Sequence, residues 1–516
     1  MKHCLWVCAI LSACVPEPST TKTTAVPEPP DSTQEAAAHI DAALMHDYKW
    51  IADQRLKWKN TPILPSLPEM ADDSTFLRRA CIDLAGRLPR PDEVRAFLAD
   101  ASPEKRTRLT EALVREPGAV EVRFRMLTEA FRVKDGDSAS IGWLRKAADE
   151  DLPYAEIVTH IIGGGHMRQR DQGNALRTAV ETAYTVLGED IYCAMCHDHP
   201  FNDHTERECY TFAACFAGKN EVRLPSDYLY KDGAPGDVVQ ASTLRLRGSW
   251  WMDLRDDEDK LTQIARWMVE DEQSRRFALV ASLRVWSSLF GMPGQMVDKT
   301  IGGVDDAPPW HGIHRKPRLN LSSDCFSASP RGQSTWVGLE INSPADFTQG
   351  MKVLIEEFLR CGGRIGEFQR ILARTDAYQR DGIDYNTDWN GCYLAPAPQI
   401  RRLPSEVIWT TLSGEVDIQL PQVPPTGHPL RMLGRGTREW TDESLTPVSH
   451  DLARFMIRRA SDSPVSRADQ DVESLFLKLL GRLPQEHERQ TIVSQSATSQ
   501  DIAWALLNTK EFMFRP

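Results

Sequence analysis

The sequence predicts a mainly α, multi-helical fold with two to three helical subdomains and a small β-hairpin or ribbon insertion near 221–250. Three observations predict it. Apolar residues recur at helical spacing along most of the chain, glycine and proline stand where those repeats stop, and one stretch alternates apolar with polar residues. Because 516 residues exceed one ordinary hydrophobic core, more than one subdomain is expected.

The first 33 residues are typical of an export signal followed by a tether. A short basic start and an apolar stretch precede Leu11-Ser12-Ala13-Cys14, which resembles the lipobox of bacterial lipoprotein signal peptides. We expect a signal peptide at 1–14, a lipid on Cys14 and a Pro/Thr-rich tether at 15–33, which cannot bury a core. An ordinary secretory signal is the alternative. Either signal exports the protein, and the lipid would hold it on a membrane as a periplasmic, outer-membrane or cell-surface lipoprotein.

An N-terminal helical domain is expected over 34–220. Glycine and proline set the ends of its helices: Gly86 stops one helix, Pro91 opens the next, and the glycine triplet at 163–165 makes a flexible turn. Helices are expected at 34–57, 76–84, 91–98, 104–115, 119–133, 141–148, 153–162, 174–187 and 205–216.

The sharpest chemical signal is the segment Cys193-Ala194-Met195-Cys196-His197, a Cys-x-x-Cys-His motif. Two thiols three residues apart can bond to the vinyl groups of one haem, and the adjacent imidazole then becomes the proximal iron ligand. With 11 cysteines among 516 residues, chance is a poor explanation of the pattern. We expect one covalent haem c on Cys193 and Cys196, with His197 on the iron.

The distal side of such an iron is not specified by the sequence. The candidate further metal ligands are His199, His204, His166 and Met167. His199 lies two residues beyond His197 and would point away from it on a single helix. An open sixth position favours small-molecule redox chemistry, whereas a closed one favours electron transfer.

Two other uses of the motif remain open. Zinc or iron bound directly by Cys193, Cys196 and nearby histidines is the main alternative to haem, and a plain disulfide between the two cysteines is the other. Export also allows the cysteines outside the motif to pair, but their spacing does not give the partners. These cysteines are Cys81, Cys209, Cys215, Cys325, Cys361 and Cys392.

Three regions follow the N-terminal domain. Residues 221–258 are expected to form a β or loop insertion, because Leu244-Arg245-Leu246-Arg247 alternates among Gly, Pro and Asp residues. A helical companion domain is expected at 259–415 with a long loop at 301–335, and a C-terminal helical region at 430–516. Helices are expected at 261–269, 275–290, 344–359, 365–375, 404–412, 444–460, 471–480, 485–495 and 499–511.

One short sequence occurs twice. Gly86-Arg87-Leu88-Pro89 recurs as Gly481-Arg482-Leu483-Pro484, and in both places an apolar helix ends at the glycine while a new helix starts just after the proline. We interpret the repeat as a shared helix-turn-helix device rather than as a shared active site.

Charge and motif content limit the function classes. A net charge of −12 without a long Lys/Arg cluster argues against nucleic-acid binding, and hydrolase elbows, zinc-protease motifs and phosphate loops are missing from the sequence. Trp250 and Trp251 offer a stacking platform for a glycan or an envelope partner, although we expect this pair to pack in the core.

Several stretches resemble a known family, the planctomycete-type cytochrome-c-like proteins, which combine an N-terminal cytochrome-c-like domain with a companion C-terminal domain of unknown function. The similar stretches are Phe76-Leu-Arg-Arg-Ala-Cys-Ile-Asp-Leu-Ala-Gly86 through Leu98, 187–216 with its Cys-x-x-Cys-His-Asp-His segment, 284–291, 371–379 and 475–514. The resemblance implies export, mostly helical structure and a c-type haem, and it supplies no substrate. Cys209, Cys215 and His204 stand where the family usually has aromatic residues.

Together, these patterns predict an exported, lipid-anchored c-type haem protein that transfers electrons or performs redox chemistry with an unknown partner protein. The alternatives are a non-haem zinc or iron protein and a surface protein that binds glycans or envelope partners. The sequence leaves open whether the protein is an enzyme.

Overall fold

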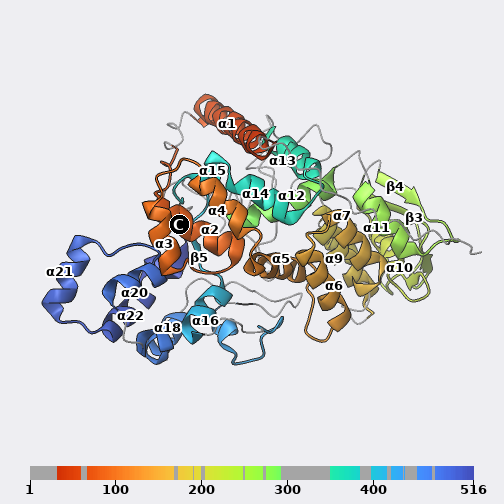
Figure 1. Ribbon diagram of the computed structural model, residues 1–516. Coiled ribbons are helices and arrows are strands. Elements are labelled where there is room, and N and C mark those ends of the chain that lie inside the picture. Colours follow the sequence, from red (N-terminus) through yellow and green to blue (C-terminus); the bar gives the residue numbers. More distant parts are fainter. Residues whose placement is uncertain are drawn as a thin grey trace, which may run out of the picture.

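The computed structural model is helical along most of its length, which confirms the mainly α fold class (Figure 1). It describes residues 32–59, 67–167, 173–189, 191–198, 204–247, 250–270, 275–291, 349–383, 397–414, 420–433, 435, 450–467 and 471–515. Cys14, His199, Cys325, Cys392 and the expected loop at 301–335 lie outside these residues. None of the described helices is long and apolar enough to cross a membrane.

The first helices begin and end where the sequence signals place them. Gly86 adopts a left-handed conformation, with φ of +65°, and closes α2, Pro91 is the first residue of α3, and Gly188 closes α9 with φ of +66°. These helices are α1 (Ser32–Lys59), α2 (Asp73–Ala85), α3 (Pro91–Ala99), α4 (Lys105–Leu113), α5 (Pro117–Ala130), α6 (Ser138–Asp149), α7 (Tyr154–Gly163) and α9 (Ala175–Leu187).

The later helices follow the predicted segments with one correction. The single helix expected at 499–511 is wrong, because the Thr509 hydroxyl accepts the Phe512 N–H at 3.1 Å and starts a separate short helix. The later helices are α10 (Glu206–Ala214), α11 (Lys260–Glu270), α12 (Arg276–Phe290), α13 (Gln349–Arg360), α14 (Ile365–Ala373), α15 (Asp376–Gln379), α16 (Ser405–Ser413), α17 (Pro429–Met432), α18 (His450–Asp462), α19 (Pro464–Arg467), α20 (Val472–Leu479), α21 (Glu486–Gln495), α22 (Ser499–Leu507) and α23 (Lys510–Met513).

The expected β insertion consists of two antiparallel pairs. Strand β1 (Glu221–Arg223) pairs with β2 (Val238–Gln240), and β3 (Thr243–Arg247) pairs with β4 (Trp250–Asp253). A further pair, β5 (Arg401–Arg402) with β6 (Phe514–Arg515), joins the companion region to the C-terminus. Helix α10, β3 and β4 lie at the end of the molecule opposite α21 (Figure 1).

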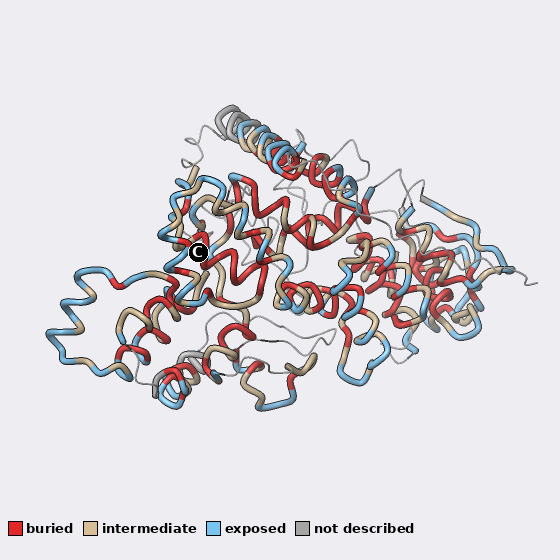
Figure 2. Tube along the Cα trace, in the orientation of Figure 1, coloured by how far each residue is buried: buried red, intermediate tan, exposed pale blue. Residues whose placement is uncertain are grey.

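Two apolar cores organise the chain. The larger core contains residues from α1 through α15, including the fully buried Trp286 of α12. It therefore joins the expected N-terminal domain (34–220) to the expected companion domain (259–415). The smaller one is built by helices α16, α18, α20 and α22, with Ile82 of α2 reaching into it. Figure 2 shows buried residues throughout the helices that form the two cores, whereas α21 contains no buried residue.

The repeated Gly-Arg-Leu-Pro sequence builds the same arginine clamp twice. Arg87 donates to both carboxylate oxygens of Glu93, at 2.8 and 3.0 Å, and to both of Glu116, at 2.8 and 2.6 Å. Arg482 makes the corresponding bonds to Glu488 and Glu511, and in both clamps the two glutamates follow the arginine by 6 and 29 residues. The repeat is therefore a helix-turn-helix device, as expected.

Candidate functional site

The Cys-x-x-Cys-His motif forms a tight turn directly after α9. Cys193–Met195 is one turn of 3₁₀ helix, and the Cys193 carbonyl accepts the N–H groups of Cys196 and His197 at 3.1 and 3.2 Å. Ile191 and Ala194 are buried and anchor the turn, while the Cys196 and His197 side chains are exposed. The fold therefore presents one thiol and the imidazole on the outside of a fixed backbone.

The hydrogen bond of His197 fixes the roles of its two ring nitrogens. Its Nδ1 lies 2.7 Å from the Asp198 carbonyl oxygen, and a carbonyl oxygen can only accept. Nδ1 therefore carries the hydrogen, and in the neutral ring Nε2 carries the lone pair. This is the arrangement that a metal-ligating histidine uses, because donation from one nitrogen orients the ring and raises the basicity of the other.

Asp198 is held in place from two further directions. Its backbone N–H donates to the Tyr230 hydroxyl at 2.7 Å, and its Oδ1 accepts the Glu206 N–H at 2.9 Å. Tyr230 comes from the segment between β1 and β2, and Glu206 is the first residue of α10. The carbonyl that binds His197 thus belongs to a residue fixed by two separate elements.

Helix α10 is itself strongly capped at this end. The Thr205 hydroxyl accepts the Glu208 N–H at 3.2 Å, and the Glu208 carboxylate accepts the Thr205 N–H at 3.1 Å. This capping box, with Thr205 as the N-cap, satisfies two backbone groups at the start of α10. The first turn of α10 therefore offers Asp198 a rigid support.

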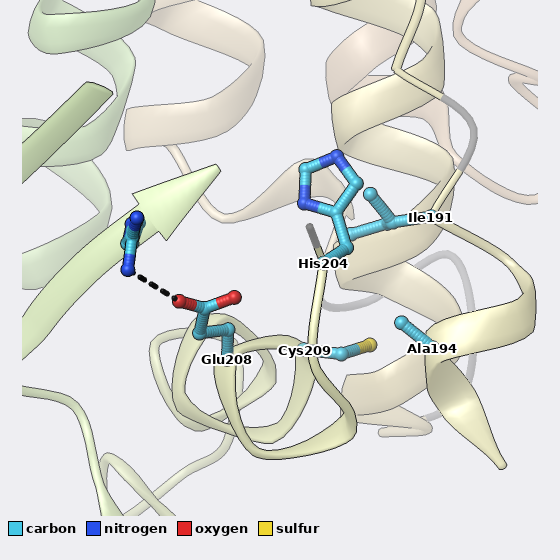
Figure 3. A pocket seen from close by; sticks show the side chains of 6 residues that line it. Ile191, Ala194, His204, Glu208 and Cys209 are labelled. Carbon is cyan, nitrogen blue, oxygen red and sulfur yellow. Dashed lines mark ion pairs between the residues drawn. The ribbon is translucent and has the colours of Figure 1, made fainter. Parts of the chain in front are cut away.

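A small hollow lies on the buried side of the turn (Figure 3). Figure 3 shows the Cys209 sulfur pointing toward Ala194. The Glu208 carboxylate forms an ion pair with the Arg245 guanidinium at 3.6 Å. The lining residues are Ile191, Ala194, His204, Glu208, Cys209 and Arg245. Within the described part of the chain this hollow leaves no interior space for even one water molecule, so it cannot enclose a porphyrin.

His204 lies inside the protein. It is 4% exposed and forms an ion pair with Glu189 at 3.7 Å, and Glu189 in turn pairs with Arg276 at 2.8 Å. The Arg276 Nε also donates to the Leu187 carbonyl at 3.0 Å. This buried network ties the end of α9 to α10 and α12, and it places His204 beside the hollow rather than beside the exposed His197.

His166 and Met167 follow the turn after α7 and are both buried. The His166 Nδ1 is 2.6 Å from the Ser140 hydroxyl and forms an ion pair with Asp137, and Met167 is 1% exposed within the larger core. Among the residues that the structure describes, no three His, Cys, Asp or Glu side chains approach closely enough to hold a metal ion. His199 lies outside the described residues, so its part in a site stays a prediction.

Three cysteines outside the motif are held in the thiol form by burial. Burial raises the pKa of the Cys209 and Cys361 thiols to about 12, and it raises the pKa of Cys81 further. Because the Cys209 thiol is free, a disulfide from Cys209 to Cys215 does not form in this structure. Thiolate chemistry at neutral pH is thus suppressed at these three positions.

Sequence reasoning missed two residues that support the site. Tyr230 lies 32 residues beyond Asp198, and no local pattern marks it. Glu206 is 2% exposed, and burial together with Asp227 and Asp198 raises the pKa of its carboxyl group. The start-of-helix position of Glu206 was the one signal that could have indicated its contact with Asp198.

Comparison with known families gives one match. Residues 55–181 match the family described as PSCyt2, a protein of unknown function (DUF1549). The match confirms the resemblance of the opening helices to a domain of unknown function, and it ends before Cys193. A cytochrome-c-like domain stays a prediction. No curated protein matches the chain. No solved structure matches it either.

Proposed function

We propose that this protein is an exported c-type haem protein, anchored through a lipid on Cys14, that exchanges electrons with a partner protein. The observation that carries the proposal is the hydrogen bond from His197 Nδ1 to the Asp198 carbonyl. It leaves Nε2 as the ligating nitrogen directly beside the Cys193 and Cys196 turn, which is the residue chemistry that covalent haem attachment requires.

The described residues fit this group in three respects. Cys193 and Cys196 stand on one turn, as two thioether bonds to one ring require, and Cys196 is exposed. His197 is exposed with its tautomer fixed. The buried Ile191 and Ala194 hold the backbone still beneath them. When bound, a c-type haem supplies one-electron chemistry at its iron.

The protein side sets the character of that chemistry. Donation from His197 to a carbonyl strengthens the imidazole as an electron donor, which favours the oxidised state of a bound iron and lowers its reduction potential. Because Cys196 and His197 are exposed, the motif is accessible to a partner protein that gives or takes electrons. Of the candidate sixth ligands, His204, His166 and Met167 are buried in the protein, which leaves His199, outside the described residues, as the candidate that we propose.

Haem staining tests the proposal. Full-length protein made in a host with c-type maturation machinery should give a haem-staining band after denaturing electrophoresis and a pyridine haemochrome spectrum of the thioether-linked type. Acid-acetone extraction should leave the pigment on the polypeptide. Complete extraction of the pigment would contradict covalent attachment of the haem. One equivalent of zinc by elemental analysis, without pigment, would favour the non-haem alternative.

One observation favours a second function. Trp251 is 59% exposed, so the expected packing of this tryptophan in the core is wrong. It stands opposite Arg245 in the β3–β4 pair, where a glycan could stack on its ring. A carbohydrate array probed with the haem-free protein and with Trp251→Ala tests this second candidate, which requires binding that the variant loses.

A further inference from the structure

Tyr230, from a distant part of the chain, contacts the residue that directly follows the motif. Its hydroxyl accepts the Asp198 N–H at 2.7 Å, and the Asp198 carbonyl accepts the hydrogen of His197 Nδ1 at the same distance. Tyr230 belongs to the insertion between β1 and β2, which contributes no residue to the motif itself. The segment between β1 and β2 is therefore linked to the His197 imidazole through a single residue, Asp198.

The Tyr230 ring is fixed by packing. It packs against an apolar cluster that includes Tyr210 of α10 and Leu224, and its ring meets that of Tyr228 edge-on with centroids 5.5 Å apart. The hydroxyl therefore occupies a defined position without help from solvent. The Tyr230 hydroxyl holds the peptide group between His197 and Asp198, and the Glu206 N–H holds the Asp198 side chain at 2.9 Å. Together these contacts fix the residue that carries the carbonyl bound by His197.

We propose that Tyr230 is a positioning residue for the proximal histidine, and that the β1–β2 insertion serves to tune the metal-binding strength of His197. The inference rests on the proposed function, since it concerns the same ligand. Loss of the hydroxyl frees the Asp198 N–H, loosens the carbonyl and weakens the bond from His197 Nδ1. A weaker bond makes His197 a poorer donor and raises the reduction potential of an iron bound to it.

The chain offers a matched control for Tyr230 in the same loop. Tyr228 is buried, and its hydroxyl donates to Asp232 at 2.5 Å without touching Asp198. Tyr230→Phe and Tyr228→Phe each remove one hydroxyl and keep both rings, so the edge-on contact survives in either variant. A difference between the variants at the motif therefore reports the Tyr230 hydroxyl rather than the packing of the loop.

Two measurements on the full chain test the role. Hydrogen exchange followed by mass spectrometry should show the Asp198 amide exchanging about tenfold faster in Tyr230→Phe than in wild type, and unchanged in Tyr228→Phe. The midpoint potential of the haem-loaded protein should rise in Tyr230→Phe only. A tenfold change in the relative affinity of His197 for the two oxidation states corresponds to about 59 mV for one electron.

The outcomes separate the two proposals. Haem-loaded Tyr230→Phe with the wild-type potential, or an equal change in Tyr228→Phe, overturns the role of Tyr230 and leaves the proposed function standing. A wild-type protein that carries no haem overturns the proposed function itself. A raised potential with faster exchange in Tyr230→Phe alone supports both.

Discussion

The chain carries two conspicuous sequence motifs, and the fold treats them in opposite ways. At the Gly-Arg-Leu-Pro turns, Arg87 and Arg482 are each enclosed by two glutamates that satisfy the guanidinium groups. At the Cys-x-x-Cys-His turn, the backbone is fixed while Cys196 and His197 face outward. The first kind of motif satisfies its own polar groups and stabilises the fold, whereas the second leaves a thiol and an imidazole exposed on a fixed turn, as the proposed haem attachment requires.

The largest effect that we expect in this series comes from removing the two thiols of the Cys-x-x-Cys-His turn. Cys193→Ala with Cys196→Ala should abolish covalent haem completely and leave the unfolding temperature of the haem-free protein close to wild type, since Cys196 is exposed. Cys361→Ala, outside the motif, should keep the haem and serves as the control. Haem staining and thermal unfolding measure the two effects, and retained covalent haem in the double variant contradicts the assignment.

Of the two clamp arginines, Arg87 should contribute more to the free energy of unfolding. Its side chain is 23% exposed, and Arg87→Ala removes the cation that binds both Glu93 and Glu116, while the more exposed Arg90 stays 3.9 Å from Glu116. Because α3 also buries Val94 and Phe97, the loss disturbs the core, and we expect about 3 kcal/mol lower free energy of unfolding. Urea unfolding measures it. A decrease of less than about 0.5 kcal/mol in the free energy of unfolding would contradict a stabilising role for this clamp.

Arg482 is the weaker copy of the clamp. Its Glu511 partner is 44% exposed, and α21 buries no residue, so Arg482→Ala should cost about 1 kcal/mol and release α21 locally. Hydrogen exchange across Glu486–Gln495 should rise while the rest of the chain stays protected. Arg489→Ala, an exposed arginine on the same helix, provides the control and should change neither quantity.

Acid should weaken both clamps. Hydrogen bonds from Arg482 hold the pKa of Glu488 below its ordinary value. Burial alone would raise the pKa of Glu93, but bonds from Arg87 and the Arg90 backbone outweigh it and lower the pKa. Both carboxylates therefore contribute stability that is present above their unfolded pKa and lost as the pH falls through the lower folded values.

The pH effect is the smallest of the series and is measured by urea unfolding between pH 7 and pH values below about 4. Wild type should lose stability over this window. Arg482→Ala should show a smaller loss because the pKa of Glu488 then returns toward its ordinary value. Equal slopes for both proteins would show that the Arg482 bonds do not set this pKa.

The sequence predicted those features that depend on short-range pattern. Helical spacing and the glycine and proline signals placed the longer described helices, whereas the short helices α15, α17, α19 and α23 were not predicted. The motif spacing singled out Cys193, Cys196 and His197, whose role stays a prediction. The two arginine clamps could also have been predicted from the sequence, because in both copies glutamates follow the arginine by 6 and 29 residues. A comparison of the two copies beyond the four shared letters would have found them.

Contacts between distant segments were beyond the sequence. Tyr230 meets Asp198 because the insertion folds back on α10, and His204 turns inward because Glu189 and Arg276 hold it there. Trp251 was misplaced for a different reason. A two-stranded hairpin covers one face only, so Leu244 of β3 is buried while Trp251 of β4 remains outside.

The most direct test of the central claim is peptide mass spectrometry of the segment containing Cys193 and Cys196, taken from protein matured in a haem-attaching host. We predict that this peptide carries the added mass of one haem, bonded through both sulfurs, in nearly every molecule. A peptide of unmodified mass, or one joined by a disulfide between the two cysteines, would contradict the account.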